Sequence, residues 1–132
     1  MKIRILSLLL ISSTILFLSC SNNDEFAEAK NISGTWNLKK IYGGFAANSN
    51  FNAGDVVWTF NTKKNTVFIE NNINTAIEPT TGTYKYTIQQ NGDKKALYIN
   101  NIRKGDIIIL SNTKLKLDFE AQADGFFTEL ER

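Results

Sequence analysis

Short stretches in which apolar and polar residues alternate, separated by turn-forming residues, are the feature that most limits how this chain can fold. Alternation with a period of two is typical of β-strands that bury one face. The clearest stretch is residues 81–90, where Tyr84, Tyr86 and Ile88 alternate with polar side chains. No comparable helical period of hydrophobicity follows residue 33. The pattern therefore predicts an all-β protein.

The turn residues divide the chain into eight predicted strands. Asn91-Gly92 is the strongest hairpin signal, because both residues accept the positive φ of a type I′ turn. Arg103-Lys104-Gly105 is a second predicted turn, and the connections at residues 42–54 and 71–80 are longer than the others. The expected strands are residues 34–41, 55–61, 66–70, 81–90, 95–100, 106–110, 113–120 and 126–130.

Most of the predicted connections are so short that consecutive strands must be antiparallel neighbours. An open sheet of eight such strands would expose two edges, and closure into a barrel removes both. We therefore expect an eight-stranded antiparallel up-and-down β-barrel. A β-sandwich is the alternative, but its crossovers require longer connections than most of those seen here.

The first residues have the pattern of an export signal. Lys2 and Arg4 precede an uncharged, Leu- and Ile-rich run at residues 5–19, which is shorter than the ~20 residues of a spanning helix. Ser19 stands directly before Cys20, the single cysteine of the chain. We expect a signal peptide at residues 1–19 and a lipid anchor at Cys20.

Residues 20–33 are polar and are expected to form a flexible tether to a folded domain at residues 34–132. Removal of Lys2 and Arg4 leaves thirteen basic and thirteen acidic side chains, so the processed chain has no net side-chain charge. Without a basic excess we expect no nucleic-acid partner. The domain is expected to be a monomer.

The composition argues against catalysis. The chain has no His and one Cys, which excludes His-dependent triads, internal disulfides and thiolate zinc sites. No phosphate-binding loop, dinucleotide glycine pattern or activated nucleophile is present. We expect no enzyme activity, no metal and no cofactor.

Three short motifs then resemble those of a known family. Gly34-Thr35-Trp36 opens the first predicted strand, Trp58-Thr59-Phe60 lies in the second, and Gly82-Thr83-Tyr84 opens the fourth. Together with Ser19-Cys20, they resemble the short lipocalin-like domains of bacterial lipoproteins of the Bacteroidetes type. The resemblance covers residues 32–132.

The resemblance implies several roles. The Cys20 thiol would carry acyl chains that hold the protein on the outer membrane. Trp36 would close the narrow end of the barrel, beside Gly34 and under an Arg that Arg132 could supply. Asp24 and Glu25, behind the anchor, resemble a surface-export signal, so both the periplasmic and the external face remain open.

The aromatic residues of the predicted strands have two interpretations. They either pack as a filled core or line a cavity for a ligand, and Tyr84 and Tyr86 suit a ligand because a buried phenol needs a hydrogen-bond partner. The loop at 42–54 contributes two further phenylalanines. The candidate ligand-binding residues are Tyr84, Tyr86, Trp58, Phe60, Phe45 and Phe51.

Two functions follow as expectations. The first is a lipid-anchored envelope protein that binds a small hydrophobic ligand in a lipocalin-like barrel. The second is a filled-core interaction or inhibitor module that contacts another envelope protein or an enzyme through its loops. Because barrels of this kind serve many roles, the fold alone does not decide between them.

Overall fold

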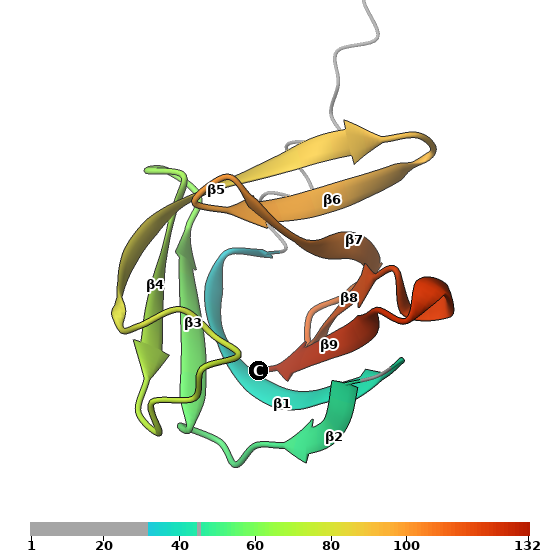
Figure 1. Cartoon of the computed structure of the whole chain (residues 1–132). Coiled ribbons are helices and arrows are strands. Elements are labelled where there is room, and N and C mark those ends of the chain that lie inside the picture. The colour runs from blue at the N-terminus through green and yellow to red at the C-terminus, as the bar shows by residue number, and fades with distance from the viewer. Residues whose placement is uncertain (1–31, 45) are drawn as a thin grey trace, which may run out of the picture.

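A computed structural model describes residues 32–44 and 46–132 of the chain, which form a ring of antiparallel strands (Figure 1). The expected signal peptide, Cys20 and nearly all of the tether lie outside the described residues. The strands are β1 (Gly34–Gly43), β2 (Ala46–Asn50), β3 (Val56–Asn61), β4 (Thr66–Asn71), β5 (Gly82–Asn91), β6 (Lys94–Ile99), β7 (Ile102–Leu110), β8 (Lys114–Phe119) and β9 (Phe126–Glu131).

The sheet closes because β1 pairs with β9 as well as with β3. From β3 to β9 each strand is hydrogen-bonded to the next, and every pair is antiparallel. β1 and β3 to β9 therefore make an eight-stranded up-and-down barrel. This confirms the predicted fold class, and all eight predicted strands are present.

β2 corrects the prediction of an irregular loop at residues 42–54. β3 pairs only with the first part of β1, from Gly34 to Asn37. β2 pairs with the remaining part, opposite Lys40 and Ile41. β2 thus pairs with the part of the β1 edge that β3 does not reach. Natural proteins usually protect an exposed strand edge in some such way.

Two predicted turns are displaced. Asn91 pairs with Lys94, so the β5–β6 turn consists of Gly92 and Asp93, and of these two residues Gly92 alone has a positive φ, at 64°. The prediction of a type I′ turn at Asn91-Gly92 is therefore wrong by one residue. Gly adopts a positive φ at lower cost than Asn does. The observed register accordingly puts Gly92, and not Asn91, at the turn position with a positive φ.

The predicted turn at Arg103-Lys104-Gly105 lies within β7. The chain turns earlier, at Asn100 and Asn101, whose φ values of 52° and 63° fit the two positive positions of a type I′ turn. The Asn-Asn pair made the turn, and the charged Arg-Lys-Gly segment continues the strand through a β-bulge described below.

Inward-facing side chains fill the barrel. The alternation read from the sequence is correct here, because the predicted apolar faces of β1, β3 and β8 are the buried ones. The core consists of Ile32, Trp36, Leu38, Ile41, Phe51, Val56, Trp58, Phe60, Val67, Ile69, Tyr86, Leu97, Ile99, Leu115, Leu117 and Leu130.

The barrel has two different ends. One end, here called the closed end, carries the short turns at 62–65, 92–93 and 111–113, together with the first residue of β1. The other end, here called the mouth, carries the β4–β5 connection at 72–81, the turn at 100–101 and the short 3₁₀ helix η1 (Ala121–Ala123). In Figure 1 the β4–β5 connection reaches toward the middle of the ring.

Candidate functional site

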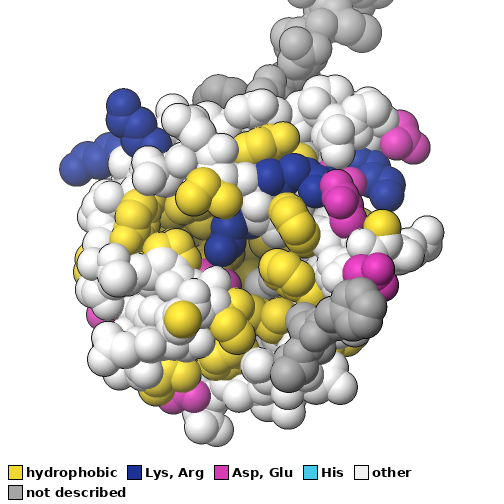
Figure 2. Space-filling model, viewed as in Figure 1, with side chains coloured by type: hydrophobic (Ala, Val, Ile, Leu, Met, Phe, Trp, Pro, Cys, Tyr) yellow, Lys and Arg dark blue, Asp and Glu magenta, His cyan; other side chains and the backbone are white. Residues whose placement is uncertain are grey.

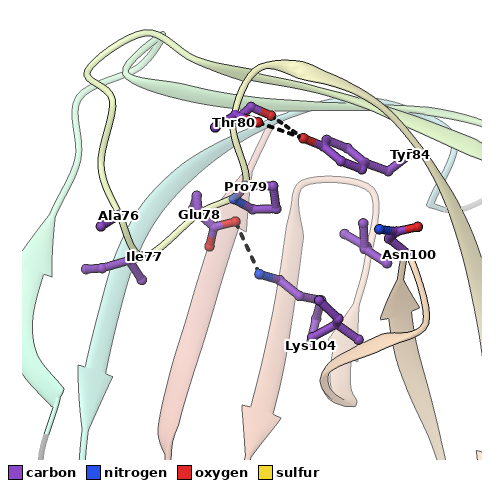
Figure 3. A pocket seen from close by; sticks show the side chains of 10 residues that line it. Ala76, Ile77, Glu78, Pro79, Thr80, Tyr84, Asn100 and Lys104 are labelled. Atoms are coloured by element: carbon purple, nitrogen blue, oxygen red, sulfur yellow. Dashed lines mark hydrogen bonds and ion pairs between the residues drawn. The ribbon is translucent and has the colours of Figure 1, made fainter.

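A pocket of about 420 Å³ lies at the mouth. Small-molecule sites commonly have volumes of about 300–1,000 Å³. Figure 2, viewed as Figure 1, shows hydrophobic side chains gathered around a hollow in the centre of one face, with basic side chains among them. The residues lining this mouth pocket are Ala76, Ile77, Glu78, Pro79, Thr80, Tyr84, Ile99, Asn100, Ile102 and Lys104 (Figure 3).

Asn71 holds the β4–β5 connection in place at the mouth. Its side-chain Nδ2 donates to the backbone oxygens of Thr75 at 2.8 Å and Pro79 at 3.1 Å, and more weakly to that of Glu78 at 3.4 Å. Its Oδ1 accepts a hydrogen bond from the Thr75 backbone N at 3.0 Å. A buried amide thus satisfies backbone groups that no strand pairs, and it fixes one wall of the pocket.

Glu78 and Lys104 form an ion pair inside the pocket. The distance from Lys104 Nζ to Glu78 Oε2 is 3.4 Å. The Lys104 side chain is 17% exposed and the Glu78 side chain is 2% exposed. Figure 3 shows the two side chains pointing toward one another from the connection and from β7. Burial raises the pKa of the Glu78 carboxyl, and the nearby Lys104 offsets only part of that effect.

Trp58 contributes to the same polar cluster from β3. Lys104 Nζ lies 5.5 Å from the centroid of its ring, within the range of a cation–π contact. The indole N–H of Trp58 also helps to lower the pKa of the Glu78 carboxyl. Its Nε1 is nevertheless buried, and no acceptor lies in the position of a well-formed hydrogen bond. Because a buried indole N–H normally has such a partner, this cluster has unused hydrogen-bonding capacity.

A β-bulge directs Lys104 into the pocket. In the β6–β7 pairing Leu97 lies opposite Gly105 and Tyr98 lies opposite Arg103, so Lys104 is the extra residue. Bulges change the direction in which a side chain points and often lie next to functional sites. Here the bulge separates Lys104 from Arg103, which pairs with Asp106 at 2.8 Å instead.

Apolar side chains surround the ion pair. Ile99 is buried at the base of the pocket, while Ile77 and Ile102 are 50% and 66% exposed at its rim. Ile73, on the same connection, is 49% exposed. The two exposed isoleucines of the lining, Ile77 and Ile102, form an apolar rim, which is typical of a site that contacts an apolar partner or ligand.

The predicted ligand-binding aromatics are placed at different depths. Tyr84 lines the mouth pocket, and its hydroxyl donates to the backbone oxygen of Thr80 at 2.6 Å. Tyr86, Trp58 and Phe60 lie in the core, where the ring centroids of Phe60 and Tyr86 are 5.0 Å apart with an edge-to-face geometry. Of these four side chains, only that of Tyr84 borders the pocket.

The two loop phenylalanines and the anchor complete the list of predicted residues. Phe51 is 7% exposed and belongs to the core, so its ring is packed against the barrel. Phe45 and Cys20 lie outside the described residues.

The predicted closing motif comes together at the closed end. The Trp36 indole is fully buried and donates from Nε1 to the backbone oxygen of Ile32 at 2.8 Å. The guanidinium of Arg132 lies over the Trp36 ring, 4.1 Å from its centroid. A Cβ at Gly34 would lie 3.5 Å from Arg132 Nη1, so the three residues are packed together.

Sequence reasoning missed Glu78 and Lys104. Glu78 stands in a stretch read only as a long connection, although it precedes Pro79, the one proline of the chain. Lys104 stands in a segment that was predicted to be a turn. Neither residue has a spacing signal, because the β4–β5 connection and the bulge in β7 bring them together only in the folded barrel.

Within residues 32–44 and 46–132 no group of three or more metal-ligating side chains is found. In that same part of the chain no helix is long and apolar enough to cross a membrane.

The fold and the site define a small antiparallel β-barrel, compatible with a lipocalin-like fold, that carries a half-open pocket at one end. No family model matches the chain, and neither a curated protein nor a solved structure matches it.

Proposed function

We propose that this chain is a lipid-anchored protein of the bacterial envelope whose lipocalin-like barrel binds a small apolar ligand in the mouth pocket. The observation that carries the proposal is the pocket itself, with a volume of about 420 Å³ and the isoleucines Ile77, Ile99 and Ile102 in its lining. Burial of apolar ligand surface against such side chains is the usual source of affinity in sites of this size.

The mouth is a better site than the barrel interior. Trp36, Trp58 and Leu97 are fully buried, and the core side chains leave the interior filled. A ligand is therefore expected to lie between the β4–β5 connection and β7, above the core. Trp58, Phe60 and Tyr86, which were expected to bind the ligand, would instead support the pocket from the core beneath it.

Native mass spectrometry of the protein extracted from the membranes of its own host tests the binding function. We expect a small molecule that leaves on denaturation. Ala76→Phe places a ring in the lining and should prevent copurification of that molecule. Ala123→Phe, at an exposed residue of η1 outside the lining, is the matched control and should retain it. Ligand-free protein under all conditions contradicts the proposal.

The anchor has its own experiment. Cys20→Ser removes the only thiol, so the protein should lose its acyl chains and leave the membrane fraction. A processed Cys20→Ser protein that stays in the membrane fraction contradicts lipid anchoring. Protease treatment of intact cells distinguishes the two locations. A protein on the external face, as the acidic residues Asp24 and Glu25 behind the anchor would favour, is degraded, whereas a periplasmic protein is protected.

The interaction module is the second candidate, and the exposed rim favours it. Ile77 and Ile102 in the lining are half or more exposed, and Ile73 on the same β4–β5 connection is 49% exposed. Such a rim could dock on an envelope protein without any small ligand. A photo-crosslinking residue at position 102 should then capture one defined partner in host cells, whereas the binding function predicts no such product.

A further inference from the structure

The charges of the mouth pocket restrict the ligands that it can hold. Among the described lining residues, Glu78 and Lys104 are the two that carry charge. With both ionised the pocket is neutral, and with Glu78 protonated it carries one positive charge. Neither state is negative, so the pocket does not favour a cationic ligand.

Both charged groups are held in place by the fold. Glu78 is positioned by the β4–β5 connection, whose backbone the buried Asn71 side chain holds through several hydrogen bonds. Lys104 is positioned by the bulge in β7. Their hydrogen bond is long, at 3.4 Å, and an ammonium has three N–H donors, so Lys104 has donors left for a ligand.

We propose that the mouth pocket binds an organic anion, with the ligand's carboxylate or sulfonate bound to Lys104 and its apolar body lying against Ile77, Ile99 and Ile102. This inference rests on the proposed ligand-binding function and specifies its substrate class. The chemistry is that of a small amphipathic acid. The ammonium supplies the charge-assisted hydrogen bond, and the isoleucines supply apolar contact.

Protonation of Glu78 adjusts this site. The groups that act on its carboxyl are Lys104 from β7 and the Trp58 indole N–H from β3; Tyr84 from β5 also borders the pocket. Burial raises the pKa of Glu78, so its proton is taken up at a higher pH than is usual for Glu. Proton uptake releases Lys104 from its ion pair and removes a negative charge beside the incoming anion. Anion binding should therefore strengthen as the pH falls.

Two fluorescent probes with the same anilinonaphthalene body test the proposal. 8-Anilinonaphthalene-1-sulfonate is an anion, and N-phenyl-1-naphthylamine lacks the sulfonate. We expect the full processed chain to bind both and to bind the anion more tightly at pH 5 than at pH 7. Affinity for the neutral probe should be the same at the two pH values.

Two variants assign the effect to the ion pair. Lys104→Met keeps most of the apolar stem and should weaken binding of the anion about 10- to 100-fold, as expected for one charge-assisted hydrogen bond, with the neutral probe unaffected. Glu78→Gln should tighten anion binding at pH 7 and remove its pH dependence. Lys64→Met, at an exposed turn of the closed end, is the control for a lost charge.

The outcomes separate this inference from the function on which it rests. If the neutral probe binds but Lys104→Met leaves the anion's affinity unchanged, the mouth pocket binds ligands without recognising an anion and the inference is wrong. If Lys104→Met loses both probes, Lys104 shapes the pocket and the inference is again wrong. If the unmutated protein binds neither probe, the ligand-binding function fails as well.

Discussion

The guanidinium carbon of Arg132 lies 4.1 Å from the centroid of the Trp36 ring, so the Arg132 side chain covers the tryptophan near the start of β1. Arg132 also donates from Nη1 to the Ser33 backbone oxygen at 2.6 Å and from Nε to that of Asn112 at 2.5 Å. One side chain thus ties the first strand, the β7–β8 turn and the C-terminus together at the closed end.

Replacing Arg132 should therefore destabilise the closed end. Arg132→Ala loses the stacking and both hydrogen bonds, and we expect a loss of about 1–2 kcal/mol in the free energy of unfolding, since the guanidinium is exposed. Arg132→Lys should recover only part, because an ammonium cannot stack flat on the ring. Urea denaturation measures both, and Lys64→Ala is the control. Equal stability of Arg132→Ala and the parent protein would contradict this role.

Removing the Asn71 amide should loosen the pocket wall. Asn71→Ala deletes hydrogen bonds to the part-buried backbone oxygens of Thr75 and Pro79 and leaves these groups without that partner, which costs about 1–3 kcal/mol. Amide hydrogen exchange at residues 75–80 should accelerate. Asn72→Ala loses only an exposed hydrogen bond to the Gly54 oxygen and should change neither quantity appreciably. Unchanged exchange in Asn71→Ala would mean that the connection is held by other contacts.

The alternation of the strands predicts the barrel because each strand buries one face. Residues such as Trp58 and Phe60 lie two apart and face the same core, so a period of two in the sequence corresponds directly to burial. The burial of Trp36 follows from the same alternation, because Trp36 and Leu38 lie two apart on one face of the first strand. Its place at the closed end was expected from the resemblance that the Gly34-Thr35-Trp36 motif carries. β2 was missed because Ala46–Asn50 is short and polar, and only the free edge of β1 makes it a strand.

The pocket was not readable in this way. Tyr84 was proposed as a ligand residue and does line it, but the pair Glu78–Lys104 spans 26 positions of the sequence. The two side chains meet because of the bulge in β7. A bulge interrupts the alternation of apolar and polar residues, and in the sequence this interruption was interpreted as a turn. Alternation thus predicts which residues form the core, whereas the mouth is formed by the departures from it.

The bulge that places Lys104 should be sensitive to its glycine. Gly105 has a φ of 137°, and a Cβ there would lie 2.9 Å from the backbone of Asp118 on β8. Gly105→Ala should cost about 1–3 kcal/mol in stability from backbone strain and should also shift Lys104 from the pocket. Gly54→Ala, at a φ of 92° with open space around it, carries strain without the clash and is the matched control. Thermal unfolding should rank Gly105→Ala below Gly54→Ala, and equal values would contradict the packing argument.

Glu78 and Glu129 should contribute to the free energy of unfolding with opposite dependences on pH. Burial raises the pKa of Glu78 in the folded state, so its contribution is present below the ordinary value of 4.5 and is lost as the pH rises through the raised value. Glu78→Gln, which resembles the protonated acid, should therefore be more stable than the parent protein at pH 7 and equal to it at pH 4.

Glu129 should behave in the opposite way. A hydrogen bond from the Tyr42 hydroxyl at 2.7 Å, together with Lys114 and Lys116, lowers the pKa of its carboxyl. Its contribution is present above the ordinary value and is lost as the pH falls through the lowered one, so Glu129→Gln should be less stable than the parent protein at pH 7 and should approach it in strong acid. Urea unfolding of both variants at pH 3, 4, 5 and 7 measures the two curves. Curves of the same sign would contradict the role of burial, because they would show that the ion pair with Lys104 controls the pKa of Glu78 in the folded barrel.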